Sequence, residues 1–190
     1  MQTTVRIIKA MDLAARMHAG QIRKGPAGEP YVNHVIEVAR LLAEATDGED
    51  EVLVIGGLLH DVLEDGPQTP AEYETLAAEI ERDFGPEVLA LVKEVTDAPS
   101  SSEAERWRNQ VAAAPRKSVR GKLLKIADKT SNLREILRDR PPRWDDAHLI
   151  GYIDWGRDVV AGCRGLNARL EAAFDRVYAD ARSKYAGRRP

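Results

Sequence analysis

The sequence predicts an all-α fold, and three observations support this prediction. Apolar residues recur at helical spacing along most of the 190 residues. No segment alternates apolar and polar residues convincingly over the length of a strand. Signals that start and stop helices are frequent. Hydrophobic residues make up 43% of the chain and aromatic residues only 5%, so we expect a core of Leu, Val and Ala, and a domain of this size buries roughly 70% of its unfolded surface.

The first three helices are predicted from apolar spacing and from their ends. The first covers about residues 5–18. The second covers about residues 34–45, with Asn33 as its expected N-cap. The third covers about residues 52–65, where the following Gly66-Pro67 stops it.

Capping signals and helix breakers define the later helices. Residues 69–72 (Thr-Pro-Ala-Glu) form a capping box with proline at the first helical position, and Gly85-Pro86 ends the helix that this box opens. Residues 102–105 (Ser-Glu-Ala-Glu) form a second capping box. Further helices are expected at about residues 86–95, 119–137 and 145–181, the last broken near Gly162 and Gly165. We therefore expect one domain over residues 1–181 and a polar C-terminal tail over residues 182–190.

The charge balance excludes several kinds of function. The chain has 28 Lys and Arg against 31 Asp and Glu, whereas proteins that bind polymeric nucleic acid normally show a basic excess. A small nucleotide needs only a local basic patch. The single cysteine, Cys163, excludes an intramolecular disulfide and fits a reducing compartment. The sequence also lacks a signal peptide and an apolar run of the ~20 residues that a transmembrane helix needs, so it predicts a soluble cytoplasmic protein with neither membrane nor nucleic-acid polymer as a partner.

The most informative segment is residues 55–66, Ile-Gly-Gly-Leu-Leu-His-Asp-Val-Leu-Glu-Asp-Gly. In a continuous helix, His60 would share a face with Glu64 and Asp61 with Asp65, since four residues separate each pair. Three carboxylates at the negative end of a helix dipole repel the dipole and one another, and a divalent metal would reverse this penalty. The alternative is a solvated acidic helix end. The preceding apolar run argues against it, because that run draws the helix into a core.

Two further residues complete a candidate metal site. His34 lies in the first turn of its expected helix, and Asp128 flanks an apolar stripe, with Asn132 one turn later on the same face. Together, His34, His60, Asp61 and Asp128 would offer two imidazoles and two carboxylates. This mixed set suits manganese, iron or zinc, and magnesium less well. Taken singly, His34 also fits a surface histidine and Asp128 a solvated helix residue.

Glu64 and Asp65 are carboxylates beyond those that the metal needs. We expect them to transfer protons, one orienting or deprotonating the attacking water and the other protonating the leaving oxygen. Such catalysis typically contributes ~100- to 10,000-fold. In the alternative, one of the two is catalytic and the other is structural.

A basic, glycine-rich loop over residues 20–30 is the candidate anion-binding segment. Its glycines let backbone amides approach an anion, and the planar guanidinium of Arg23, beside Lys24, suits a phosphate or a base. The alternative is a solvated basic loop. His18 continues the apolar face of the first helix and is expected to be a core or supporting histidine. Tyr152 fits either a core position or a position that stacks on a ligand.

Several segments of the chain carry a family resemblance, and together they span about residues 5–180. They read His-x-x-Gln-x-Arg-Lys to Glu-Pro-Tyr-Val-Asn-His over 18–34, Leu-Leu-His-Asp-Val-Leu-Glu-Asp over 58–65, Glu-Val-Thr-Asp over 94–97, the stretch 122–134, and Tyr-x-x-Trp over 152–155. In this order they resemble the HD-domain (p)ppGpp hydrolases of the RelA/SpoT superfamily. The length resembles that of the small single-domain alarmone hydrolases of the metazoan SpoT-homologue type.

The resemblance implies an all-α, HD-domain helical bundle and a reaction. The implied ligands of Mn²⁺, or of another divalent metal, are His34, His60, Asp61 and Asp128. The implied catalytic pair is Glu64 and Asp65. The resemblance implies Arg23 and Lys24 near the small nucleotide substrate and Asn132 near its ribose or phosphates. We also expect Tyr152 and His148 to bind the substrate. The expected reaction removes the 3′-pyrophosphate from ppGpp or pppGpp and gives GDP or GTP.

The chain departs from the family pattern at three places. Val35 follows His34, where the family commonly has proline. The segment 98–103 has no basic residue, and His148 stands where an arginine is common. The last two departures remove expected phosphate contacts and leave the metal ligands intact. Two alternatives therefore stand beside (p)ppGpp hydrolysis: an HD-type phosphatase acting on another nucleotide such as NADPH, and a nucleotide sensor without turnover, against which the intact catalytic carboxylates argue.

Overall fold

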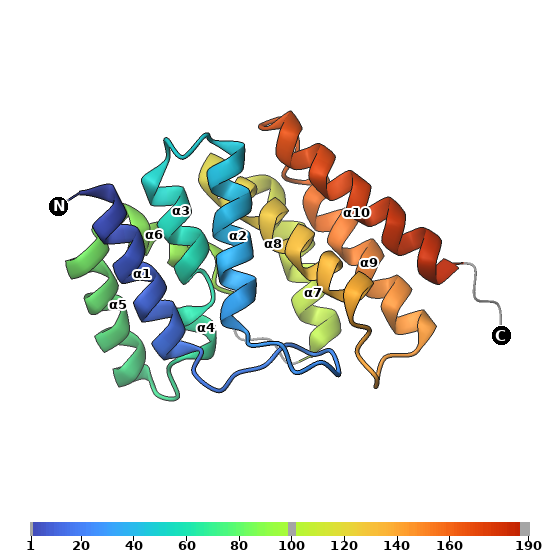
Figure 1. The fold of residues 1–190 in the computed structure, drawn as a ribbon, viewed down its shortest axis with the longest axis horizontal. Helices are drawn as coiled ribbons and strands as arrows, with labels where there is room; N and C mark the ends of the chain where they lie inside the picture. Colours follow the sequence, from blue (N-terminus) through green and yellow to red (C-terminus); the bar gives the residue numbers. More distant parts are fainter. Residues whose placement is uncertain (1, 99–101, 187–190) are drawn as a thin grey trace. The chain divides into compact units, whose positions relative to one another are not determined.

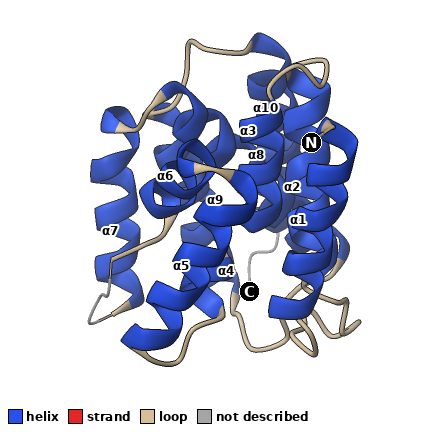
Figure 2. Ribbon diagram, turned by 90° about the vertical axis from the view of Figure 1, so that its left-hand side faces the viewer, coloured by secondary structure: helices blue, strands red, loops and turns tan. Residues whose placement is uncertain are grey.

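A computed structural model describes residues 2–98 and 102–186, and the regular elements in these ranges are helices (Figures 1 and 2). The all-α prediction is confirmed. The chain divides into two compact units, one of Met1–Gln21 with Pro30–Ala98 and the other of Ile22–Glu29 with Pro99–Pro190. Within the described ranges, none of the helices has both the length and the apolar character needed to cross a membrane.

The first unit is built around one almost wholly buried helix, α3. Seven of its nine residues are buried, because they are apolar or glycine, and it packs against α1, α2 and α6. Gly57 allows α2 to approach closely, since a Cβ atom there would lie 2.8 Å from Leu42 Cδ1 and 3.1 Å from the Cα of Ala39. The helices of this unit, from blue to green in Figure 1, are α1 (Thr3–Met17), α2 (Val32–Ala45), α3 (Glu51–Leu59), α4 (Val62–Asp65), α5 (Pro70–Phe84) and α6 (Pro86–Val95).

The continuous helix predicted over residues 52–65 is wrong. Helix α3 ends at Leu59, His60 and Asp61 form a turn, and a separate helix, α4, follows. The backbone amides of Glu64 and Asp65 both donate to the carbonyl oxygen of Asp61, at 3.1 and 2.9 Å, so the hydrogen bonding of α4 starts afresh at this turn. The expectation that His60 shares a helix face with Glu64, and Asp61 with Asp65, therefore does not hold, because it required a continuous helix.

The second unit is built around α8, which packs against α9 and α10, while α7 packs against α9. Thirteen of the twenty residues of α8 are buried, and several of them are polar or charged. The predicted break near Gly162 and Gly165 is confirmed, because it separates α9 from α10. The elements, from yellow-green to red in Figure 1, are α7 (Glu103–Ala113), η1 (Ala114–Arg116), α8 (Val119–Arg138), α9 (Asp146–Ala161) and α10 (Ala168–Ala186).

The helix starts predicted from capping signals are confirmed at α5 and α7. Thr69 and Glu72 form the reciprocal capping box of α5, and the side chain of Ser102 caps α7. The prediction for α2 is wrong. Asn33 lies inside that helix, and Tyr31 occupies the N-cap position without a capping bond from its side chain.

The first residues of the expected polar tail, 182–186, belong to α10, which continues to Ala186. Tyr185 connects the last turn of this helix to α8. Its ring is 1% exposed, and its hydroxyl donates to the carbonyl oxygen of Ile136 at 2.8 Å. Residues 187–190 lie outside the described part of the chain.

Candidate functional site

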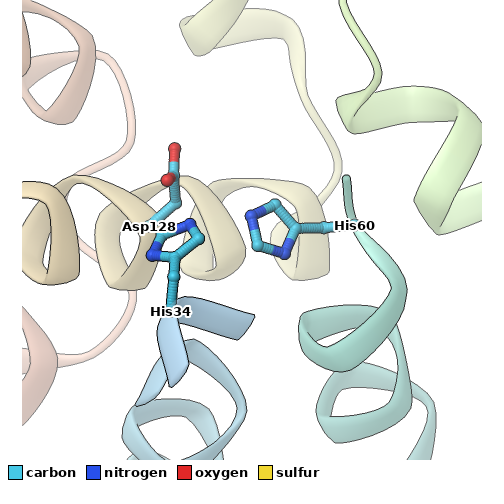
Figure 3. A group of neighbouring side chains, drawn as sticks. All are labelled: His34, His60 and Asp128. Carbon is cyan, nitrogen blue, oxygen red and sulfur yellow. The ribbon is translucent and has the colours of Figure 1, made fainter. Parts of the chain in front are cut away.

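His34, His60 and Asp61 lie together in the first unit. The ring centroids of the two histidines are 5.2 Å apart, with the ring planes at 64° (Figure 3). The Oδ2 atom of Asp61 lies 3.0 Å from Nε2 of His60 and 3.6 Å from Nε2 of His34. Helix α2 supplies His34, and the turn between α3 and α4 supplies the other two. His34 is 3% exposed, so it is not a surface histidine.

Hydrogen bonds orient two members of this group, His60 and Asp61. Nδ1 of His60 lies 2.8 Å from the carbonyl oxygen of Gly57. A carbonyl oxygen only accepts, so Nδ1 carries the proton and Nε2 keeps the lone pair that a metal ligand needs. The hydroxyl of Tyr31 donates to Asp61 Oδ2 at 2.7 Å. Two imidazoles and one carboxylate are ligand types that fit a divalent cation.

Glu64 and Asp65 extend from α4, and both are exposed. Oδ2 of Asp65 accepts a hydrogen bond from Nε2 of Gln21 at 2.9 Å. Oε2 of Glu64 accepts one from the backbone amide of Asp97 at 3.4 Å. Each carboxylate is therefore held by a different segment of the first unit, one just after α1 and the other just after α6.

Asp128 lies on α8 in the second unit and is 6% exposed (Figure 3). It is therefore not a solvated helix residue. Its Oδ1 atom accepts a hydrogen bond from Nδ2 of Asn132 at 2.6 Å, and its Oδ2 atom lies 3.0 Å from Nζ of Lys129. Lys129 is itself buried, with Nζ 4.1 Å from the centroid of the Trp155 ring. Its positive charge offsets part of the cost of burying the carboxylate.

An ion pair and hydrogen bonds join the basic loop to α8 within the second unit. Arg23, 6% exposed, forms an ion pair with Glu135, and its Nη2 atom donates to Oδ1 of Asn132 at 3.4 Å. The backbone amide of Lys24 donates to Oε1 of Glu135 at 3.1 Å. Asp128, Asn132 and Glu135 are spaced four and three residues apart and so form one stripe of α8. Arg23 is therefore not part of a solvated loop.

Gly25 allows this loop to lie against the end of α8. A Cβ atom at Gly25 would overlap the carboxylate of Asp139, whose Oδ2 atom also accepts a hydrogen bond from the amide of Ala27 at 2.8 Å. The sequence predicted that the glycines serve an anion. The structure shows that this one serves close packing of the backbone against a side chain.

Tyr152 and His148 belong to an aromatic cluster in the second unit that includes the three tryptophans of the chain. The rings of Trp107 and Trp155 stack, with centroids 5.1 Å apart and planes at 12°. The ring of Trp144 lies 4.4 Å from that of His148 and 4.9 Å from that of Tyr152, measured between centroids. Tyr152 therefore packs among aromatic rings, and His148 lies at the same cluster.

Charges surround the aromatic cluster. Burial raises the pKa of Tyr152 well above its usual value, and the carboxylate of Asp128 raises it further, so the phenol stays protonated and can donate a hydrogen bond. Nζ of Lys24 lies 5.2 Å from the centroid of Trp144. Nε2 of His148 lies 3.8 Å from Oε2 of Glu103. The cluster therefore offers both cationic and hydrogen-bonding groups.

Sequence reasoning missed the residues that support these groups. Tyr31, Lys129 and Glu135 each hold a predicted site residue, as described above. Only Glu135 could have been found from the sequence, because its spacing from Asp128 places both on one face of a helix. A buried lysine and a supporting tyrosine look the same in a sequence as solvated or core residues, because their partners are set by tertiary packing.

Replacing Glu135 with alanine should destabilise the protein by ~3–5 kcal/mol, because it removes the carboxylate that pairs with the buried Arg23. Urea unfolding measures this change. Arg138→Ala is a matched control, since its ion pair with Glu29 joins the same loop to the same helix but is exposed, and such pairs contribute ~0–1 kcal/mol. Equal, small losses in both variants would show that the buried pair does not hold the loop.

Comparisons with known proteins agree on one family. Residues 10–148 match the HD-domain model HD_4. Human MESH1, a guanosine-3′,5′-bis(diphosphate) 3′-pyrophosphohydrolase, is 40% identical over 173 residues, which cover 91% of this chain and 93% of that protein. Drosophila melanogaster MESH1 is 39% identical over 175 residues, 92% and 94% of the two chains. A solved structure of a metazoan ortholog of SpoT that hydrolyzes ppGpp matches with a TM-score of 0.82 at 38% identity, covering 92% of this chain and 94% of that one.

Proposed function

This chain belongs to the HD-domain family, and we propose that it is a metal-dependent hydrolase that removes the 3′-pyrophosphate from ppGpp or pppGpp to give GDP or GTP. The observation that carries the proposal is the close group of His34, His60 and Asp61, in which both histidines are buried. It occurs in a chain that is similar to MESH1 over 91% of its length. Intact metal ligands and spare carboxylates favour an enzyme over a nucleotide sensor.

For the metal, we propose four ligands: His34, His60, Asp61 and Asp128. Their chemistry supports this choice. Imidazole together with carboxylate suits Mn²⁺ and other divalent transition metals. We propose Mn²⁺ as the resident ion. When bound, it would supply an activated water and neutralise phosphate charge.

Glu64 and Asp65 are the proposed proton-transfer groups. One carboxylate accepts a proton from the attacking water, and the other donates a proton to the ribose 3′ oxygen as the bond to phosphorus breaks. Both side chains are exposed, so they can exchange protons with solvent between turnovers. Their separate anchors, on Gln21 and on the amide of Asp97, allow two different roles.

On the substrate side, we propose contacts from Arg23, Lys24, Asn132, Tyr152 and His148. Arg23 is fixed by Glu135 and so is already ordered before a nucleotide binds, which lowers the entropic cost of binding. The protonated phenol of Tyr152 can donate to a phosphate oxygen. Lys24 adds positive charge beside the aromatic cluster.

Incubation with Mn²⁺ and ppGpp, pppGpp or NADPH tests the proposal directly. Release of pyrophosphate from ppGpp, with GDP as the second product, is the expected result. Release of inorganic phosphate from NADPH with no reaction of ppGpp would replace the proposal by the alternative substrate. Binding of ppGpp without any turnover would replace it by a sensor.

We expect His148→Arg to lower the KM for ppGpp about threefold to tenfold, because it adds a permanently charged, forked phosphate donor. Steady-state kinetics measure the change in KM. His148→Gln serves as the uncharged control. A KM that does not change in the arginine variant would show that position 148 does not face the phosphates.

A further inference from the structure

Two polar residues just after α1, His18 and Gln21, connect the core of the first unit with Asp65. His18 is the C-cap residue of α1 and is 3% exposed. Its Nδ1 atom lies 2.6 Å from Oε1 of Gln21. Nε2 of Gln21 in turn donates to Oδ2 of Asp65 at 2.9 Å. Three side chains thus form a hydrogen-bonded chain from the core of the first unit to α4.

Asp65 fixes the direction of both side-chain hydrogen bonds in this series. An ionised carboxylate only accepts, so the amide nitrogen of Gln21 must face Asp65. The amide oxygen of Gln21 must then face His18, and Nδ1 of His18 must carry the proton. The orientation of the exposed carboxylate is therefore linked to the tautomer of the buried imidazole.

The buried end of the chain is held by packing. The ring centroid of His18 lies 4.9 Å from that of Tyr31. The backbone amide of Tyr31 donates to the carbonyl oxygen of Gln21 at 2.9 Å, and the amide of Gln21 donates to the carbonyl oxygen of His18 at 3.1 Å. Gln21 is therefore fixed through its backbone as well as its side chain. Asp65, by contrast, is exposed on a helix of only four residues, and without a fixed partner its side chain would sample several rotamers.

We propose that Gln21, oriented by His18, is a positioning residue that holds the Asp65 carboxylate in one orientation for proton transfer. This inference rests on the proposed function for the role of Asp65. A buried polar atom without a hydrogen-bond partner costs free energy, and the contact with Gln21 gives Nδ1 of His18 such a partner.

The tautomer of His18 tests the chain of hydrogen bonds without any measurement of activity. Long-range ¹H–¹⁵N NMR spectra at alkaline pH should show the Nδ1–H form in the wild type. In Asp65→Ala the side-chain amide of Gln21 can rotate by half a turn, so both tautomers of His18 should appear. An Nε2–H form in the wild type, or a single unchanged tautomer in Asp65→Ala, would overturn the inference even if the enzyme hydrolyses ppGpp.

Kinetics then test the effect on catalysis. Gln21→Ala should lower kcat about 10- to 100-fold, the range expected for one hydrogen bond to a charged group, with KM and Mn²⁺ affinity nearly unchanged. Gln68→Ala is the matched control, because the exposed side-chain amide of Gln68 donates to the carbonyl oxygen of Gly66, and this variant should retain wild-type kcat. In an Asp65→Asn background, Gln21→Ala should change kcat by less than about twofold, since a residue acting through Asp65 is not additive with it. Full additivity would reveal a merely structural role and refute the proposal.

Two variants of His18 distinguish the hydrogen bond that its ring donates from the packing of the ring. His18→Asn keeps an N–H donor close to the position of Nδ1 and should retain most of the wild-type kcat. His18→Phe keeps a ring against Tyr31 but cannot donate, and we expect it to reproduce the loss seen in Gln21→Ala. Equal activity of the two variants would overturn the role of His18. If the wild type releases no pyrophosphate from ppGpp, the proposed function fails, while the tautomer measurement still decides whether Asp65 and His18 are linked.

Discussion

Replacing Asp61 with alanine should abolish both metal binding and hydrolysis while the helix content stays the same. Its carboxylate lies within 3.0 Å of His60 and 3.6 Å of His34. The start of α4 depends on the backbone carbonyl of Asp61, which accepts the amide hydrogen bonds and remains in the variant. Loss of a supporting partner of a metal ligand typically costs 10–100-fold, so we expect loss of the ligand itself to exceed ~100-fold in Mn²⁺ affinity.

Isothermal titration with Mn²⁺, far-UV circular dichroism and pyrophosphate release measure the three effects. Tyr31→Phe is a graded control, because it removes only the hydroxyl that donates to Asp61. We expect that variant to lose ~10–100-fold in metal affinity or activity. Wild-type Mn²⁺ affinity in Asp61→Ala would remove Asp61 from the ligand set.

Glu64→Gln and Asp65→Asn should each retain the metal and lose most of kcat. The amide side chains have the size of the carboxylates but neither accept nor release a proton at neutral pH. General acid or base catalysis typically contributes ~100- to 10,000-fold. Both positions are exposed, so the free energy of unfolding should change little. Single-turnover kinetics with saturating Mn²⁺ measure the loss.

Glu74→Gln is a suitable control for these two variants, since it neutralises another exposed carboxylate of the first unit and should leave kcat unchanged. A loss of only a few-fold at both catalytic positions would contradict proton transfer by either. A large loss at only one of them would support the alternative in which one carboxylate is catalytic and the other is structural.

The helices could be predicted from the sequence because their signals are local. The capping box of Thr69 and Glu72, the proline at the start of α5 and the break near Gly162 act through contacts within about one helical turn, and each is confirmed. The same local reasoning was wrong at Asn33 and over residues 52–65. At the second of these, a continuous apolar and acidic pattern does not show that the hydrogen bonding of α4 starts anew at Asp61.

The types of residue in the candidate site were also evident from the sequence. His34, His60, Asp61 and Asp128 were chosen for their chemistry, and the family resemblance supported the choice. Their burial could not be read from the sequence, where His34 also fitted a surface position and Asp128 a solvated one. Tertiary packing excludes both alternatives, since the two side chains are only 3% and 6% exposed.

The sequence by itself determined the all-α class, most helix boundaries and the identity of the groups that can do chemistry. Tertiary structure alone decided what orients those groups. Gln21 reaches Asp65 across 44 residues of chain, Tyr31 reaches Asp61 across 30, and the loop at Lys24 reaches Glu135 across 111. Helical periodicity relates residues only three or four positions apart. A hydrogen bond between segments depends on how whole helices pack, so no local pattern records which glutamine, tyrosine or glutamate will hold a side chain of the candidate site in place.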